Sequence, residues 1–243
     1  MSAQLRYKRV VVKISGECLC PAGGSGIDVA CLAAVADEIA EVHALGVQLG
    51  LVVGAGNYIR GRDLTSPAAR KLVLRTTADT MGMLGTVING LALRDAMDAR
   101  KIPVTLMSAI PMGNVCEPFV RRKAVERLDQ GHVVIFAGGT GSPFFTTDMC
   151  AALRAGEIDA QAVMKATKVD GVYDSDPVKN PSARKYERLS YQKVIDDRLG
   201  IMDLTAIALC MENNIPILVY QLSNTGSIAR ALCGRKVGTL IAD

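Results

Sequence analysis

Short apolar runs alternate along this chain with segments of helical periodicity. The first run, residues 10–14, is rich in valine and isoleucine and predicts a strand buried on both faces. After Asp28, a typical helix N-cap, apolar residues recur every three or four positions as far as Val42, which predicts a helix that Gly46 ends. The same patterns predict strands at 47–53, 103–107, 133–137, 162–165, 217–220 and 239–241, and helices at 77–99, 121–130, 148–155, 191–198, 204–213 and 227–232. Because strand, glycine loop and helix repeat in this order, we predict an α/β fold with a mostly parallel sheet and helices on both faces.

The pattern does not divide the 243 residues into separate domains. No change in composition marks a linker, and the turn-rich stretch at 174–188 is interpreted as a turn cluster inside one domain covering 1–243. The Ser66–Pro67 pair is typical of a helix start. The long helix predicted after it carries four apolar residues on one face, namely Met81, Leu84, Ile88 and Leu91.

Composition and charge exclude several function classes. Lys and Arg exceed Asp and Glu by only 28 to 24, and the aromatic residues are four Phe, six Tyr and no Trp. This small surplus and the shortage of rings for base stacking argue against a nucleic-acid partner. The longest stretch without Asp, Glu, Lys or Arg, 42–59, is broken by glycines, whereas a membrane helix needs about 20 mostly apolar residues. Since the N-terminus also lacks a signal-peptide pattern, we expect a cytoplasmic protein with no membrane partner.

The cysteines and histidines offer little for metal or nucleophilic chemistry. Seven scattered cysteines do not form a disulfide framework. Cys18 and Cys20 have the wrong spacing for a zinc site, and the sequence has no second closely spaced cysteine pair that could complete one. With only His43 and His132, neither a histidine-rich metal site nor a Ser-His-Asp triad is expected. The sequence therefore predicts no dedicated metal site.

Unusual residues follow four of the predicted strands, at 13–16, 54–57, 138–141 and 165–168. In parallel sheets, ligands bind beyond the carboxyl ends of the strands. Glycine lets backbone N–H groups approach a phosphate closely, so these loops indicate more than one phosphate group. Each loop alone also fits an ordinary strand-to-helix turn. The chain has no Gly-Lys pair and no G-x-G-x-x-G, which excludes a P-loop, a Rossmann dinucleotide loop and a protein-kinase loop.

Six segments carry a family resemblance that covers residues 7–241. They are KISGE, GAGNYIRGRDL, ADTMGMLGTVINGLALRDA, MSAIPMGNVCEPF, AGGTGSPFFTTD and KATKVDGVYDSDP. The chain resembles the bacterial UMP kinases of the amino acid kinase family. The last segment is shared widely in that family, whereas the third and fifth are more specific to the UMP kinase branch. The resemblance implies one αβα domain with the amino acid kinase fold, whose N-terminal half binds mainly UMP and whose C-terminal half binds mainly ATP.

The resemblance also implies an activity, its ligands and an assembly. The γ-phosphate of MgATP would pass to UMP in pyrimidine nucleotide synthesis, with Mg²⁺ arriving on the nucleotide. A homohexamer, activation by GTP and inhibition by UTP are expected. Because the acceptor phosphate is already ionised, no general base is needed, which agrees with the scarcity of histidine. The segment linked to GTP activation, which also fits an ordinary loop, would be Pro21, Ala22, Gly23, Gly24, Ser25 and Gly26.

Four residues are implied in catalysis, and each also has a simpler interpretation. Lys13 and Lys165 would contact the transferred phosphoryl group from opposite sides, or else be solvated strand ends. Arg60 would add positive charge at the phosphates, or lie on a helix surface. Asp148 would orient the lysines; it also fits the N-cap of the following helix, and both roles can hold.

The resemblance assigns further residues to the two nucleotides. Asp79 would bind the ribose hydroxyls of UMP, although the helix dipole also favours an acid in a first helical turn. Tyr173 would lie beside the ATP nucleoside, or in the core. The UMP site would comprise Ala55, Asp79, Thr140, Gly141, Ser142, Pro143, Phe144, Phe145, Thr146 and Thr147. The ATP site would comprise Lys13, Ile14, Ser15, Gly16, Gly56, Arg60, Thr167, Tyr173 and Asp176.

Two positions depart from the family pattern. Ala55 stands where a GGGN segment has its second glycine, and a positive φ there would cost about 1 kcal/mol. Ser142 replaces an asparagine and shortens one polar side chain near the nucleotide. Both departures bear on the affinity for UMP rather than on the identity of the substrate.

Two other functions remain open at the level of sequence. A carboxylate kinase of the acetylglutamate or aspartate type would share the fold and the ATP half, but Asp79 and TGSPFFTT suit a nucleotide acceptor better. A non-catalytic storage or sensor protein is the second alternative. The retention of Lys13, Lys165 and Asp148 argues against a loss of catalysis.

Overall fold

A computed structural model describes residues 5–59, 71–222 and 226–243. Within these ranges nine strands form one sheet, in the order β4-β3-β5-β2-β1-β6-β10-β11-β9. The strands are β1 Arg9–Ile14, β2 Gln48–Val53, β3 Val104–Ser108, β4 Glu117–Pro118, β5 Val133–Ala137, β6 Val163–Thr167, β9 Arg188–Leu189, β10 Ile217–Gln221 and β11 Thr239–Ile241. Every neighbouring pair is parallel except β10 with β11. The predicted mostly parallel sheet is confirmed.

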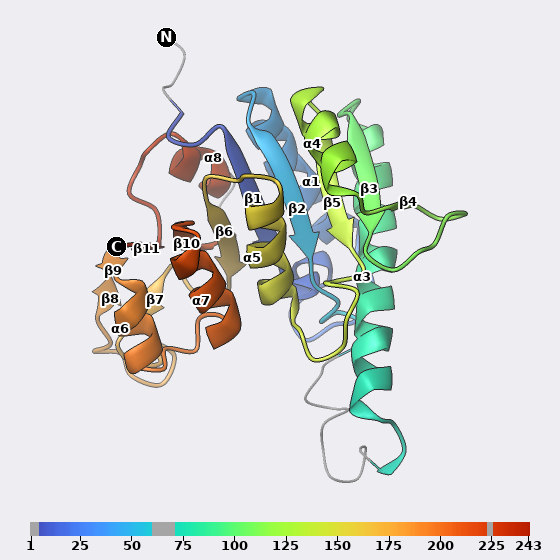
Figure 1. Cartoon of the computed structure of the whole chain (residues 1–243). Helices are drawn as coiled ribbons and strands as arrows, with labels where there is room; N and C mark the ends of the chain where they lie inside the picture. Colours follow the sequence, from blue (N-terminus) through green and yellow to red (C-terminus); the bar gives the residue numbers. More distant parts are fainter. Residues whose placement is uncertain (1–4, 60–70, 223–225) are drawn as a thin grey trace.

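Helices cover both faces of this sheet (Figure 1). One face packs against α1 Val29–Ala44, α3 Arg75–Asp98 and α8 Ser227–Leu232. The other packs against α4 Arg121–Asp129, α5 Thr147–Glu157, α6 Tyr191–Asp196 and α7 Leu204–Glu212. Because strand side chains alternate, Val10, Val12 and Ile14 enter the first core, whereas Val11 enters the second. The predicted αβα layering is therefore confirmed.

Most predicted elements agree with the structure to within two or three residues. Asp28 caps α1 as expected, since its side chain accepts a hydrogen bond from the Cys31 backbone N–H. Gly46 follows the helix with φ +76°, a conformation that glycine adopts without strain. The sequence did not predict the shortest elements, which are a 3₁₀ turn at Gly16–Leu19, the strands β4 and β9, and the separate antiparallel pair of β7 Val172–Tyr173 with β8 Lys185–Tyr186.

The apolar face predicted for the long helix is only partly the face that meets the sheet. Met81, Leu84 and Ile88 are 40%, 38% and 47% exposed, and only Leu91 packs against the core. The buried face of α3 instead carries Ala78, Met83, Gly85, Thr86, Val87, Asn89, Gly90, Leu93 and Met97. Helix α3 carries apolar residues on all of its sides, so their spacing in the sequence alone could not identify the buried side. An exposed apolar stripe of Met81, Leu84 and Ile88 remains on α3.

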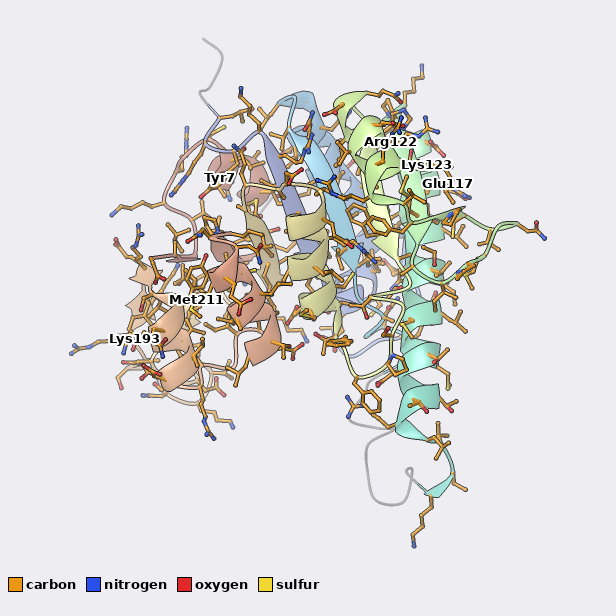
Figure 2. The ribbon with its side chains drawn as sticks, in the orientation of Figure 1. Tyr7, Glu117, Arg122, Lys123, Lys193 and Met211 are labelled. Carbon is orange, nitrogen blue, oxygen red and sulfur yellow. The ribbon has the colours of Figure 1, made fainter. Side chains whose placement is uncertain are left out.

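Two further sequence predictions concern the cysteines and the Ser66–Pro67 pair. All seven cysteines are free thiols, as the sequence predicted. Ser66–Pro67 lies outside the described residues. Arg122 and Lys123 on α4 lie at the opposite end of the molecule from Lys193 on α6 (Figure 2), so these cations do not share a patch. Among the described helices, none combines the length and apolar character that a membrane span requires.

Candidate active site

Four loops that the sequence singled out meet at one edge of the sheet. The strands before them, β5, β2, β1 and β6, are consecutive neighbours and run parallel. Gly16, after β1, packs against the loop after β2: a Cβ on Gly16 would lie 2.5 Å from both Gly54 O and Asn57 Oδ1. Only glycine fits this approach. The expected gathering of the four loops at the carboxyl ends of the strands is confirmed.

Two lysines and one aspartate form a compact cluster at this edge. Lys13 on β1 and Lys165 on β6 are partners in the β1–β6 register, so their side chains leave the sheet on the same face. On that face, α5 carries Asp148 in its first turn. Lys13 Nζ lies 3.0 Å from Asp148 Oδ1, and Lys165 Nζ donates to Asp148 Oδ2 at 2.6 Å. The simpler interpretation of both lysines as solvated strand ends is wrong.

Burial governs the electrostatics of this cluster. The side chains of all three residues are only 12–13% exposed to solvent. Burial would raise the pKa of Asp148, but the charges of Lys13 and Lys165 outweigh it, so that the pKa lies below its usual value. Burial lowers the pKa of Lys165, which Asp148 only partly offsets. Lys165 Nζ also donates to the Ile201 carbonyl. Two ammonium groups against one carboxylate leave the cluster with a net positive charge, which suits an anionic ligand.

Lys13 and Asp148 form a close ion pair, which contributes to the lowered pKa of Asp148. Asp148 Oδ1 is buried, and Lys13 Nζ lies 3.0 Å away from it. Lys13 is thus held by one carboxylate oxygen, while Lys165 has two oxygen acceptors.

Thr146, and not Asp148, is the N-cap of α5. Its Oγ1 accepts a hydrogen bond from the backbone N–H of Asp148 at 3.1 Å, so the N-cap interpretation of Asp148 is wrong. Thr146 Oγ1 in turn donates to Asp203 Oδ2. The sequence analysis missed Asp203. It precedes α7 in the position of an N-cap, yet its side chain makes no capping bond there, and its charge acts on Lys165.

Asp79 connects α3 to the loop predicted to bind UMP. Its Oδ2 accepts a hydrogen bond from the Phe144 backbone N–H at 2.8 Å, and Arg75 Nε lies 3.1 Å from both carboxylate oxygens. Arg75 also lies 5.8 Å from the centre of the Phe144 ring. Because α3 begins at Arg75, Asp79 is in the second turn, so its interpretation as a first-turn acid is wrong. The structure brings Asp79 together with the segment 140–147.

That segment is exposed and partly strained. Phe144 has a φ of +73°, which is costly for a residue with a side chain. Phe144 and Phe145 are 65% and 48% exposed. Thr140 Oγ1 accepts a hydrogen bond from the Ser142 backbone N–H at 3.3 Å and donates one to the Ser142 carbonyl at 3.2 Å. Thr140 therefore fixes the backbone of Ser142. Between them, Gly141 takes a φ of +81°. The loop presents backbone groups and hydroxyls, which can distinguish hydrogen-bonding patterns.

Residues predicted for the ATP nucleoside make local contacts. Thr167 Oγ1 donates to Val169 O at 2.6 Å. The Tyr173 hydroxyl donates to Asp170 Oδ1 at 2.6 Å, a hydrogen bond that raises the pKa of Tyr173. Tyr173 is half-buried and belongs to neither core, so its interpretation as a core residue is wrong. Asp176 Oδ1 accepts from Val178 N at 3.0 Å. No hydrogen bond or ion pair among the described residues joins these three side chains to Lys13 or Lys165.

Ala55 is not strained. It is absent from the described residues with positive φ, so the cost anticipated for a methyl group does not arise. A Cβ on Gly85 of α3 would lie 2.8 Å from the Ala55 Cβ, which shows that the methyl group packs against the helix. The neighbouring Gly56 faces Glu17, since a Cβ on it would lie 3.2 Å from that side chain. Arg60 lies outside the described residues.

The segment 21–26 lies beside the same loop. Pro21, Ala22 and Gly23 are exposed, whereas Gly26 is half-buried. The Gly26 backbone N–H donates to the Asn57 carbonyl at 2.9 Å. The segment thus contacts the β2 loop of the site directly.

Comparison with known proteins shows that the chain is similar to uridylate and UMP kinases over nearly its whole length. The profile of the Amino acid kinase family matches residues 8–221. The chain is 50% identical over 240 residues to a uridylate kinase of Pseudomonas paraeruginosa, covering 99% of this chain and 96% of that protein, and matches one of Ectopseudomonas mendocina equally well. Its fold is similar to the UMP kinase from Bacillus anthracis, with a TM-score of 0.93 and 38% identity over 98% and 96% of the two chains. The UMP kinase from Ureaplasma parvum gives a TM-score of 0.90 and 35% identity over 98% and 100%.

Proposed function

The chain belongs to the amino acid kinase family, and we propose that it transfers the γ-phosphate of MgATP to UMP, giving UDP and ADP. The cluster of Lys13, Asp148 and Lys165 carries this proposal, because it places two cations where neighbouring strands end. The uridylate and UMP kinases to which the chain is similar over nearly its whole length supply the choice of acceptor.

The chemistry requires anions to be held together. Two unit charges 4 Å apart repel by about 1 kcal/mol in water and by about 4 kcal/mol at an effective dielectric constant of 20. Lys13 and Lys165 offset this repulsion and stabilise the charge on the phosphoryl group in transit. An oxygen of the UMP phosphate bonds to the γ-phosphorus while the bond to the bridging β,γ-oxygen breaks. Asp148 touches no reacting atom in this proposal; it holds the two lysines in register as a positioning residue.

The nucleotides occupy opposite sides of this cluster in the proposal. Asp79, which already contacts the 140–147 loop, binds the UMP ribose, and that loop with Ala55 encloses the uracil and phosphate. On the other side, Ile14, Ser15, Gly16 and Gly56 hold the ATP phosphates together with Arg60. The nucleoside of ATP lies by Thr167, Tyr173 and Asp176.

Mg²⁺ is proposed to arrive with ATP and to neutralise charge on its phosphates. Among the described residues, no three His, Cys, Asp or Glu side chains form a group that could hold a metal ion. The carboxylate nearest the proposed reaction, Asp148, is already paired with two lysines. These residues fit a cation carried by the phosphates better than one held in a protein cage.

An ADP-release assay with several acceptors tests the function. With MgATP, we expect strong turnover on UMP, much poorer turnover on CMP, and none on aspartate or N-acetylglutamate, because the loop reads hydrogen-bonding groups of the base. dUMP tests the assigned ribose contact of Asp79. Strong turnover on an amino acid with none on UMP would identify a carboxylate kinase instead. No turnover on any acceptor would favour the storage or sensor alternative.

The exposed apolar stripe of α3 supports an oligomer, and we propose a homohexamer with this stripe in a subunit contact. Light scattering should give a mass near six times the 25.8 kDa of one chain. Ile88→Glu should lower that mass, since it puts a charge in the middle of the stripe. Val29→Glu changes another exposed apolar residue, 79% exposed on α1, and should leave the mass unchanged. A monomer in the unmodified protein would contradict the hexamer.

The proposal extends to regulation and cellular role. GTP is proposed to activate through the segment 21–26, which contacts Asn57 through Gly26, and UTP is proposed to inhibit. The product UDP leads to UTP and CTP in pyrimidine nucleotide synthesis. A cytoplasmic location is proposed, to which seven free thiols are suited because a reducing compartment keeps cysteines unpaired.

A further inference from the structure

We propose that Asn57 and Asn89 are positioning residues whose side chains form one buried amide pair. This pair fixes the loop after β2 to helix α3 and sets where it meets the loop after β1. The inference rests on the proposed function only for its kinetic consequence. Its structural part can be tested without any substrate.

The geometry of the pair is complete. Asn89, in the middle of α3, is 0% exposed, and Asn57, after β2, is 2% exposed. Asn57 Nδ2 donates to Asn89 Oδ1 at 2.9 Å, and Asn89 Nδ2 donates to Asn57 Oδ1 at 2.8 Å. The second hydrogens go to backbone carbonyls, from Asn57 to Gly26 and from Asn89 to Gly54, each at 2.8 Å. All four amide hydrogens therefore have acceptors. Because a carbonyl can only accept, the orientation of both amides is fixed.

Packing alone does not explain an asparagine at position 89. Asparagine is a poor residue for a helix interior, and a buried amide is costly unless it is fully hydrogen-bonded. The neighbouring buried positions Val87 and Leu93 are apolar. The Asn89 amide instead has a role at the site, because it donates a hydrogen bond to the Gly54 carbonyl, directly after β2.

The pair controls the contact between two loops assigned to the nucleotides. Gly16 meets Asn57 Oδ1 and Gly54 O so closely that a Cβ on it would lie 2.5 Å from each. Gly16 is three residues after Lys13, so a shift of the β2 loop changes the support of the β1 loop. The Gly26 backbone bonds to Asn57 as well, through both its N–H and its carbonyl. Losing the pair would loosen three segments at once.

Helix α3 provides a matched control one turn away. The Thr86 hydroxyl, 2% exposed, accepts a hydrogen bond from the Gly138 backbone N–H at 2.8 Å and donates to Met83 O. Thr86 thus ties α3 to the loop after β5, whereas Asn89 ties it to the loop after β2. Each variant should loosen its own loop and leave the other in place.

Hydrogen exchange of the free protein tests this assignment. Asn89→Ala should speed exchange about tenfold or more in segments 16–26 and 54–59 and leave 138–142 unchanged. Thr86→Val should give the opposite pattern. If Asn89→Ala does not fold, Asn57→Ala removes the same pair from the loop side. The same exchange pattern in both variants, or no change in 54–59, would overturn the inference.

Kinetics then test the consequence for catalysis. Asn89→Ala should lower kcat/KM for UMP about tenfold to a hundredfold, because small displacements of binding loops are costly. The double variant Asn57→Ala/Asn89→Ala should lose little more, since the two side chains act as one unit. Fully additive losses would overturn the pair. Failure of the unmodified protein to phosphorylate UMP would instead reject the proposed function, and the exchange result would still stand.

Discussion

Lys13→Ala is expected to lower kcat for UDP formation by about a thousandfold while the protein stays folded. Removing one fixed donor at a position of developing charge costs about 10²–10³ in rate, or about 3–4 kcal/mol. Lys13 is 12% exposed and faces Asp148 at 3.0 Å, so its charge acts in a partly desolvated site. The truncation leaves Asp148 paired with Lys165, so the strongest contact of the cluster survives. The measurement is kcat at saturating MgATP and UMP, with thermal unfolding to verify the fold.

Lys236→Ala is the matched control for this variant. Lys236 also forms an ion pair, with Glu187 at 2.9 Å, but it is 87% exposed and outside the site. Surface pairs of this kind contribute about 0–1 kcal/mol, so stability and kcat should both stay near those of the unmodified protein. Near-normal turnover of Lys13→Ala would show that the lysine takes no part in the chemistry.

The sequence predicted the edge of the sheet that carries the site because local signals agreed there. Valine and isoleucine runs marked the central strands, and the glycine loops marked where each of them ends. The parallel arrangement then followed from the alternation of strands and helices. What the sequence did not predict is the register. The direct pairing of Lys13 with Lys165, which points both lysines at α5, depends on strand contacts between residues about 150 positions apart.

The features that were missed depend on tertiary contacts. Asp203 fits an ordinary helix N-cap in the sequence, and only the fold turns it toward Thr146. Asn89 is one of two buried polar side chains on α3, with Thr86, and nothing local shows that it meets Asn57. The two-residue strands β4 and β9 exist only through pairing with another strand, which for β9 is β11, far along the chain. The family resemblance, rather than spacing, directed attention to Asp79 and the 140–147 loop.

Asp148→Asn is expected to lower kcat about a hundredfold and to destabilise the protein. The carboxylate is the shared partner of Lys13 and Lys165, and without it two buried ammonium groups repel each other. Breaking a buried pair by removing one partner costs about 3–5 kcal/mol; the remaining exposure of the lysines favours the lower value, about 3 kcal/mol. The rate falls because the lysines are no longer held in position, and a misplacement of about 1 Å costs about a hundredfold. Urea unfolding at pH 7 and kcat at saturating substrates measure the two effects.

The pH profile separates this role from a loss of folding. Asp148 has a lowered pKa in the folded protein, so its contribution to stability is present above the ordinary aspartate pKa and is lost as the pH falls through the folded pKa. In Asp148→Asn that acid-dependent loss should be absent.

Lys165 already has a pKa lowered by burial, and Asp148 opposes the shift, so removing the carboxylate should lower the pKa of Lys165 further. Since Lys165 must be protonated to stabilise the phosphoryl group, the alkaline limb of kcat should move to lower pH. Asp159→Asn, which changes a 69% exposed partner of Arg121, should leave that limb in place. An alkaline limb of Asp148→Asn that stays in place or moves to higher pH would contradict the coupling between Asp148 and Lys165.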